Sequence, residues 1–529
     1  MCALPRLFFC FLFAVAALPY AVQGQVAPSD IHFTRQGVRR FVFDNQHALP
    51  IAALKPAEVI GMSSMYPVRQ YSDDPARVTV DHDQLHIDSD AEAHAAIWFG
   101  GFNPFATYTL AVASSEGEGS VGFEFADADN ANRFVVAVAY RGRDIVDVKL
   151  NINKGAEVVT SQSIATHIPA GAKLRGKIIF QLLGSGLTVY TEHEGLPQPI
   201  AQADFSQQLD LRAKRYLRTF QSRISVQLKQ GAVAINEATA ALTSGMGLAD
   251  IRAMTYEDGS PLLDQGRLWY TMSIRGRALP HHIQGVFSMD PTVFDLQFEG
   301  VIVFDRADGI LRNEVASHIF YDRQDQVWRG ITTGFSAYAD PKEHKQLLAV
   351  ESTKDPRFGF SVMQAEPFGV VGDIEDPHIL FDAAAGKWRI LTCENIDGYK
   401  AVLLESDAWN RGYRRIAGPV DHNATGTSIQ RIDGVPYCFS GSSEREIFIY
   451  SYPDLREVGT LKMDLPPWDN DSGTRVWPNV VELPAGYPFR YVALMMDRFN
   501  YPGLVGPNWT YGALYLYHGH VDDVRRAIP

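Results

Sequence analysis

The sequence has few cysteines and no excess of basic residues, and both shortages narrow what the protein can be. Only 4 of its 529 residues are cysteine, too few for a disulfide-rich secreted scaffold. Lysine and arginine number 48 against 61 aspartates and glutamates, which gives a formal net charge of −13. An acidic chain without a basic patch is a poor partner for nucleic acid, and the sequence holds no such patch. We therefore expect no nucleic-acid partner.

Long apolar runs are scarce beyond the N-terminus. The run Leu7–Leu18 follows the basic Arg6, and the small residues of positions 21–24 come next. This order is typical of a secretion signal, and the run is too short to span a bilayer comfortably. We predict that residues 1–24 are a signal peptide, that the rest has no membrane span, and that the protein is secreted or periplasmic.

Cysteine use after the leader is sparse. Cys2 and Cys10 would leave with the signal, so Cys393 and Cys438 remain. Their offsets along the predicted strands differ, and we expect two buried thiols rather than a disulfide. Two thiols alone build no metal site, and we expect no metal-binding residues and no cofactor.

Helical periodicity is nearly absent, and strand patterns fill the first half of the chain. From about Ala95, short alternating or fully apolar runs are separated by Gly, Asp and Asn clusters, which is typical of a β-sandwich. We predict a sandwich domain over residues 25–245, with an irregular N-terminal lead. The phrase Gly122–Phe125 followed by Asp127–Phe134 resembles the concanavalin-like or laminin-G-like jelly rolls of secreted glycosidases. Such a domain either braces its neighbour or binds sugar through exposed aromatics such as Trp98.

A repeated phrase fills residues 246–529. An apolar strand, a turn and an aromatic strand recur five times at about fifty to sixty residues, which suits four-stranded propeller blades. The five apolar strands are Ser260–Leu263, His318–Tyr321, His378–Phe381, Ser428–Arg431 and Asn479–Glu482. The expected fold class is therefore all-β: an N-terminal β-sandwich followed by a five-bladed β-propeller.

Acidic residues precede three of these five strands. The preceding pairs are Glu257-Asp258, Asn313-Glu314, Glu375-Asp376, Ala424-Thr425 and Trp477-Pro478. Innermost strands converge on the propeller axis, so their first residues line one funnel. Carboxylates crowded there repel one another, which favours a general acid beside an ionised base, the pair that glycoside hydrolysis needs. We predict Asp258, Glu314 and Asp376 as the catalytic residues.

The third blade resembles a known family. Ile374–Asp382, ending in Gly386-Lys387-Trp388, resembles the Asp-Pro motif of family 43 glycoside hydrolases, which with families 32, 62, 68 and 117 are five-bladed propellers. The resemblance implies a carbohydrate substrate and, at most, a structural calcium on the axis. It implies that Asp376 orients and tunes the acid, that Asp258 is the base and that a fourth-blade glutamate is the acid.

The fourth blade departs from that pattern. It presents Thr425-Gly426-Thr427 where the family has its acid. Glu314 is the first substitute and His422 the second, since family 117 is understood to use a histidine. His378, His422, Arg475 and Trp477 are the predicted substrate-binding residues.

Three functions stay open on the sequence. The first is a secreted glycoside hydrolase, expected to be inverting, which would need its two carboxyls about 6.5–9.5 Å apart. The second is a non-catalytic carbohydrate-binding propeller, favoured by the missing fourth-blade acid. The third is a polysaccharide lyase acting on a uronate polymer, in which His378, His422 and Arg475 would serve.

Overall fold

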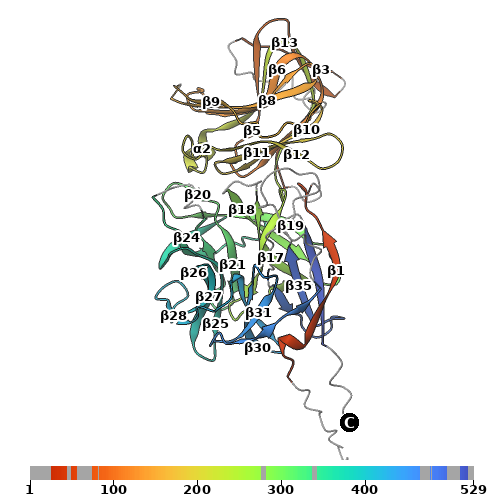
Figure 1. Ribbon diagram of the computed structural model, residues 1–529. Coiled ribbons are helices and arrows are strands. Elements are labelled where there is room, and N and C mark those ends of the chain that lie inside the picture. Colours follow the sequence, from red (N-terminus) through yellow and green to blue (C-terminus); the bar gives the residue numbers. More distant parts are fainter. Residues whose placement is uncertain are drawn as a thin grey trace, which may run out of the picture.

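Two all-β bodies stand one above the other (Figure 1). The computed structural model describes residues 25–44, 49–55, 74–81, 83–155, 157–275, 281–335, 342–464, 477, 479–496 and 513–521. The fold class is confirmed: a β-sandwich is joined to a five-bladed β-propeller. No helix in the described part of the chain has the length and apolarity needed to cross a bilayer.

The sandwich is organised by two long paired strands, β6 (Thr107–Ala126) and β13 (Gln221–Leu242). Along one edge β13 pairs with β5 (Ala93–Gly101), β4 (Gln84–Ser89) and β2 (Leu49–Leu54). Along the other edge β6 pairs with β7 (Arg133–Arg141) and β10 (Gly176–Leu183). The strands β3 (Arg77–Asp81), β8 (Asp144–Lys154), β9 (Glu157–Ser163), β11 (Gly186–Glu192) and β12 (Gln198–Asp204) extend the sheet. Alternate residues such as Phe123 and Leu110 point into one shared core, as the period of two requires.

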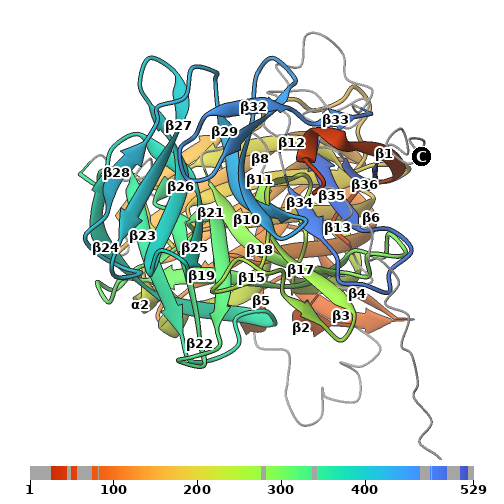
Figure 2. The same ribbon diagram turned by 90° about the horizontal axis from the view of Figure 1, so that it is seen from below.

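The propeller consists of five four-stranded meanders, which Figure 2 shows from the propeller end. The first blade consists of β14 (Leu248–Ala253), β17 (Arg267–Arg275), β18 (His282–Met289) and β19 (Gln297–Asp305), and the second of β21 (Val315–Asp322), β22 (Val327–Thr333), β23 (Gln346–Ser352) and β24 (Gly359–Val371). The third consists of β25 (Ile374–Asp382), β26 (Lys387–Asn395), β27 (Tyr399–Ser406) and β28 (Arg414–Ala417), and the fourth of β29 (Thr425–Ile432), β30 (Val435–Gly441), β31 (Ile447–Ser451) and β32 (Glu457–Thr460). The fifth consists of β34 (Val480–Glu482), β35 (Tyr491–Met496), β36 (Leu514–Val521) and β1 (Ile31–Arg39).

The last blade takes its outer strand from the far end of the chain. β1 pairs antiparallel with β36, and Phe33 is fully buried in the core of that blade. Figure 2 shows the red β1 beside the blue β36. The prediction that residues 31–39 belong to the irregular lead of the sandwich domain is therefore wrong. The sandwich is inserted between the closing strand of the propeller and its other strands.

The first blade also differs from the prediction. Its innermost strand is β14, which starts three residues after Gly245, and not Ser260–Leu263. The predicted segment contributes only the short β16 (Leu263–Asp264), which pairs with β17. Before it, β15 (Thr255–Tyr256) runs parallel to the end of β21. The phrase therefore marks the inner strand in four blades and misses it in the first.

Candidate functional site

Four inner strands carry a β-bulge at one equivalent position near their start. The bulged residues are Asp250 in β14, Ala316 in β21, Asp376 in β25 and Gly426 in β29. All four have positive φ angles, between 54° and 60°. A positive φ is unfavourable for a residue other than glycine, and such strain is typical of functional sites. The first and third blades thus place aspartates in matching strained positions at one end of the axis.

Asp250 lies in an ion pair. Its Oδ2 accepts a hydrogen bond from the Ser273 hydroxyl at 2.5 Å and one from Arg275 Nη2 at 3.0 Å. The Asp250 side chain is buried, and Ser273 is completely so. A charged hydrogen-bond donor in such a buried place stabilises the ionised carboxylate. Asp250 is therefore equipped to act as a base.

Asp376 has few polar partners. Its Oδ2 accepts the Gly426 N–H at 2.8 Å, and the Cys393 thiol lies 3.8 Å away. The residue is 3% exposed. Burial first, and then the charge of Glu375, raise the pKa of Asp376 to about 7, against the opposing charge of Arg252. Near neutral pH this carboxyl is therefore able to hold a proton that it can donate.

Arg252 links the inner strands across the axis. Its Nη2 donates to the main-chain carbonyl of Asp376 at 2.8 Å, and its Nη1 donates to the carbonyl of Thr427. The guanidinium is fully buried and lies 5.5 Å from the centre of the Trp477 ring. Burial lowers the pKa of Arg252, while the charges of Asp376 and Asp250 act in the opposite direction. The cation therefore binds carbonyls rather than neutralising either aspartate directly.

Two buried histidines stack beside this cluster. The rings of His318 and His378 are 3.8 Å apart and nearly parallel. His318 accepts the Ile379 N–H at 3.0 Å through Nδ1, and its Nε2 faces the Thr255 hydroxyl at 3.2 Å. Burial, with the nearby Arg252, lowers the pKa of His318 to about 3. Neither ring nitrogen of His378 has a hydrogen-bond partner among the described residues, and the ring is 1% exposed. Burial lowers the pKa of His378 well below its usual value, so this predicted substrate-binding residue is a buried neutral ring.

One group of side chains has the spacing of metal ligands. Atoms of Glu375, Asp376 and Cys393 lie within 4.8 Å of one another. The Lys345 ammonium already binds Glu375 at 2.6 Å. Burial raises the pKa of the Cys393 thiol well above its usual value, so it stays a protonated donor. Calcium requires six to eight oxygen ligands, and this group fits neither calcium nor a thiolate-bound metal. We assign no metal to it.

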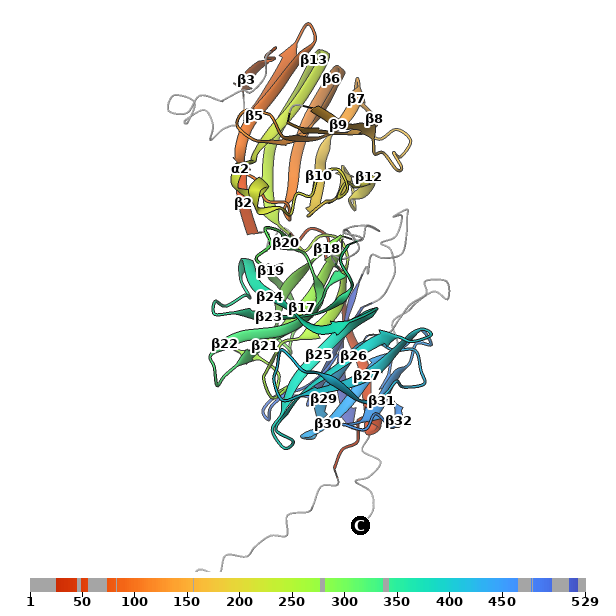
Figure 3. The same cartoon turned by 90° about the vertical axis from the view of Figure 1, so that its left-hand side faces the viewer.

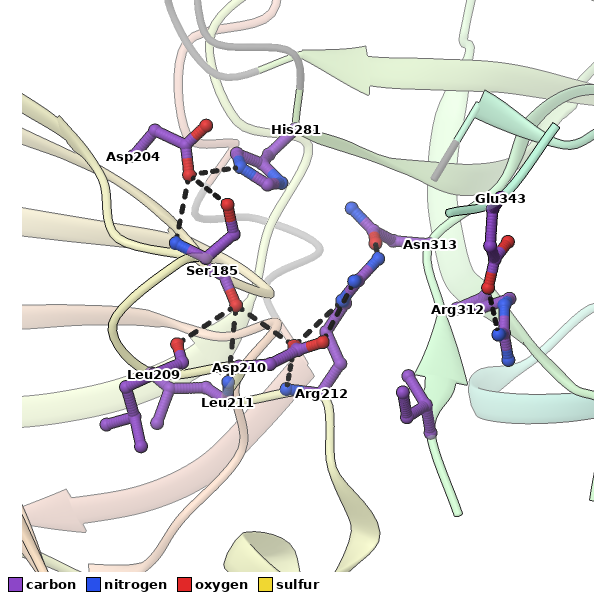
Figure 4. A network of polar contacts seen from close by, with 12 residues as sticks. Ser185, Asp204, Leu209, Asp210, Leu211, Arg212, His281, Arg312, Asn313 and Glu343 are labelled. Carbon is purple, nitrogen blue, oxygen red and sulfur yellow. Dashed lines mark hydrogen bonds and ion pairs between the residues drawn. The ribbon is translucent and has the colours of Figure 1, made fainter. Parts of the chain in front are cut away.

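Glu314 lies where the two domains meet. It is 1% exposed and directly precedes β21. Figures 1 and 3 both show β18 and β20 (Leu311–Arg312) on the propeller face nearest the sandwich. From the sandwich, Arg212 binds Asp210 through two hydrogen bonds of 2.9 Å and contacts Asn313 at 3.5 Å (Figure 4). Burial opposes the charge on Arg212, but the ion pair with Asp210 and the charge of Glu314 raise its pKa. A sandwich residue therefore interacts with the predicted acid.

A second contact crosses the same boundary. His281, on the propeller, lies 3.1 Å from an oxygen of Asp204 at the end of β12, as Figure 4 shows. Burial favours the neutral form of Asp204, but the contacts with His281 and Ser206 hold the pKa of this carboxyl well below its usual range. The sandwich thus braces the propeller at the face where the inner strands begin. Trp98, by contrast, is 50% exposed on β5.

Asp258 lies at the other end of the propeller. It follows β15, which runs beside the end of β21, whereas Asp376 lies at the start of β25. Asp258 binds Arg323 at 2.9 Å, and its Oδ1 accepts a hydrogen bond from the Ser260 hydroxyl. The structure does not bring Asp258 to Asp376, and the equivalent position in the first blade belongs to Asp250.

His422 also lies away from the axis. Its ring stacks on Phe448 at 3.7 Å, and its Nε2 contacts Glu457 of β32 at 3.1 Å. Both partners belong to outer strands of the fourth blade. The structure therefore separates His422 from the axial aspartates and gives it the contacts of a surface residue.

Trp477 reaches the axis but is not an open platform. It is 4% exposed, and its indole N–H donates to the Ile251 carbonyl at 2.9 Å. Its ring lies against Gly426, where an added Cβ would come within 2.6 Å of it. Trp477 packs the site instead of presenting a face to a sugar. Arg475 lies outside the described residues. Cys393 and Cys438 are free and buried, which confirms the two predicted thiols.

The sequence reasoning missed Asp250 and Arg252. Both stand in Leu248-Ala249-Asp250-Ile251-Arg252, directly after the glycine pair Gly245 and Gly247. The pairing of strands within a blade could have indicated them. In the other blades the inner strand pairs with the aromatic second strand that follows it. In the first blade the aromatic strand is β17, which contains Trp269 and pairs with β14.

Comparisons with known proteins give structural likenesses only. No protein-family model and no curated protein sequence matches the chain. Similar solved structures include an endo-1,4-beta-xylanase from Bacteroides thetaiotaomicron, with a TM-score of 0.34 and 12% identity over 53% of this chain and 93% of that one. Another is the Coprinopsis cinerea family 62 alpha-L-arabinofuranosidase catalytic domain (TM-score 0.35, 11% identity, 52% and 91%). A third is Bacillus subtilis levansucrase (0.35, 12%, 53% and 87%). At TM-scores and identities this low, the likenesses carry no argument about activity.

Proposed function

We propose that the protein is a glycoside hydrolase that cleaves a polysaccharide or oligosaccharide with two axial aspartates. The observation that supports this most directly is the chemical difference between Asp250 and Asp376. They occupy equivalent bulge positions in two blades, yet one is ion-paired and the other has a pKa raised to about 7. A charged carboxylate beside a protonated one is the pair that glycosidic cleavage uses.

In this proposal Asp376 is the general acid and Asp250 the general base. Asp376 protonates the leaving oxygen, and Asp250 activates the attacking water. Glu314 is the weaker candidate for the acid, because its charge interacts with the buried Arg212. The two aspartates belong to inner strands that each contact β21, and the charge of Asp250 is among those that raise the pKa of Asp376. The proposal includes inversion, which requires room for a water molecule between the two carboxyls.

The experiment measures reducing-sugar release across a panel of polysaccharides, with ultraviolet absorbance followed in parallel. Turnover should fall at least about a hundredfold in Asp250→Asn and Asp376→Asn, since acid–base catalysis typically contributes that much. Asp258→Asn is the matched control, because its carboxylate lies at the opposite end of the propeller, and it should keep wild-type turnover.

The same assay separates the rival functions. Sugar binding without any turnover would instead support a carbohydrate-binding propeller. An unsaturated, ultraviolet-absorbing product would support a lyase on a uronate polymer. Loss of activity in Asp258→Asn, with Asp250→Asn active, would restore the original assignment of the base.

We also propose that the protein acts outside the cytoplasm, because Leu7–Leu18 and the small residues after it have the pattern of a secretion signal. N-terminal sequencing of the exported protein tests this and should show that residues 1–24 have been removed. A structural calcium stays an expectation from family resemblance alone.

A further inference from the structure

The two axial aspartates have neighbours at the same place in their blades. Ser273 of β17 stands opposite Ala249, the residue before the first-blade bulge. Cys393 of β26 stands opposite Glu375, the residue before the third-blade bulge. The pseudo-symmetry of the propeller therefore gives each aspartate one side chain at an equivalent position on the second strand.

The contacts made from these two positions differ. The Ser273 hydroxyl donates to Asp250 Oδ2 at 2.5 Å. The Cys393 sulfur lies 3.8 Å from Asp376 Oδ2, and its thiol also points to the Glu375 carbonyl at 3.4 Å. Both residues are fully buried. A hydroxyl is a good hydrogen-bond donor to a carboxylate, whereas a thiol is a weak one. The side chain at this position therefore stabilises a charged carboxylate in the first blade and scarcely does so in the third.

We propose that Cys393 is a positioning residue: its thiol withholds from the Asp376 carboxylate the strong donor that the Ser273 hydroxyl gives to Asp250 at the matching site. The choice of thiol or hydroxyl thus decides which aspartate is the acid and which the base. This inference deepens the proposed function and rests on it for its catalytic meaning.

The other groups around Asp376 do not replace the missing donor. Arg252 binds the main-chain oxygen of Asp376 and not its carboxylate. Thr333 accepts a hydrogen bond from the Asp376 N–H. The carboxylates of Glu375 and Asp250 oppose the ionisation of Asp376. Among the residues that the structure describes, the Gly426 N–H is the one donor to the Asp376 carboxylate besides the thiol. A stronger hydrogen-bond donor at position 393 would therefore lower the pKa of Asp376 markedly, because this carboxylate is poorly solvated.

The test follows Asp376 directly by NMR, in full-length protein with ¹³C-labelled aspartate carboxyls, its signal assigned by its loss in Asp376→Asn. In the wild type the signal should titrate near pH 7. In Cys393→Ser the midpoint should fall by about one pH unit, the effect of one added hydrogen bond to a carboxylate. Cys393→Ala is the matched control, because it removes the thiol without adding a donor, and its midpoint should not fall.

Equal midpoints in the wild type and Cys393→Ser would overturn the inference. If Cys393→Ser does not fold, Cys393→Thr places a hydroxyl donor at the same position, and the Asp376 midpoint should fall in the same way. An unchanged Asp376 midpoint in that variant would equally overturn the inference. The proposed function is judged separately by turnover: shifted midpoints in a protein without hydrolase activity would uphold the role of Cys393 and refute the glycosidase.

Discussion

Arg252 donates to the carbonyl oxygen of Asp376 at 2.8 Å, so a cation from the first blade holds the strained bulge of the third. The same guanidinium reaches Thr427 in the fourth blade and lies against Trp477 before the fifth. One buried side chain thereby joins four blades at the end of the axis where the aspartates lie. The position of Asp376 depends on it.

Arg252→Lys should destabilise the protein by about 2–4 kcal/mol, because one ammonium cannot reproduce the forked geometry and leaves a buried carbonyl unpaired. Urea unfolding followed by tryptophan fluorescence measures the loss. Arg175→Lys, on an exposed arginine, is the matched control and should change stability by less than about 0.5 kcal/mol. Equal stability of the two variants would contradict the bridging role.

The raised pKa of Asp376 gives a pH dependence with a definite sign. Between about pH 4, where the unfolded carboxyl ionises, and about pH 7, where the folded one does, the folded state binds the extra proton. The contribution of this group to the free energy of unfolding is therefore greatest at low pH and falls as pH rises through this window. The difference in stability between wild type and Asp376→Asn should decrease from pH 4 to pH 7. A constant difference would show that the folded carboxyl has an ordinary pKa.

The domain boundary should depend on Arg212. Arg212→Met removes the two hydrogen bonds that the guanidinium donates to Asp210, and it removes the cation beside Glu314. The substitution should cost about 2–4 kcal/mol. Limited proteolysis should then cut the connection between the domains faster than in wild type. Arg218→Met, on an exposed position of the short helix α2 (Lys214–Thr219), is the control and should behave as wild type. The double variant Asp210→Asn with Arg212→Met should lose less free energy of unfolding than the two single variants lose together.

Closure of the propeller should depend on β1. Phe33 is fully buried in the last blade, so Phe33→Ala should cost about 3–5 kcal/mol. Thermal unfolding should show the loss in the propeller, while hydrogen exchange of the sandwich strands stays unchanged. Arg35→Ala, an exposed site on the same strand, should be nearly neutral. A truncated chain that begins after residue 44 lacks β1 and should fail to form a stable propeller. Wild-type stability of that truncated chain would refute closure by β1.

Much of the architecture could be read from short-range patterns. The aromatic second strands and apolar first strands marked β21, β25, β29 and β34 because alternation is a local property of the chain. β1 escaped because its partner is distant in sequence: it pairs with β36, nearly the whole chain away. β14 escaped because Ser260–Leu263 lies between it and its partner β17 and has the same apolar pattern. Nothing local in Ile31–Arg39 distinguishes a closing strand from an irregular lead.

The site shows the same division. Asp376 was found through its Asp-Pro context, which is local. The sequence spacing predicts Asp258 for the first blade and misses Asp250. Register within a blade is not fixed by spacing, and a shift of a few residues carries a side chain to the other end of the axis. His422 and Trp477 are predicted to bind substrate, but packing decides their roles: His422 stacks on Phe448 near the surface, and Trp477 is buried against Gly426.

The sequence by itself determined the repeating strands, the two buried thiols and the acidic start of the third blade, because alternation and composition act over neighbouring residues. Only the tertiary structure decided which carboxylates meet. The bulge positions of Asp250 and Asp376 become equivalent when five blades close round one axis, and Ser273 and Cys393 then stand beside them. Each of these two contacts is made within one blade, but Asp250 and Asp376 are more than a hundred positions apart, so no local pattern could show that their positions match.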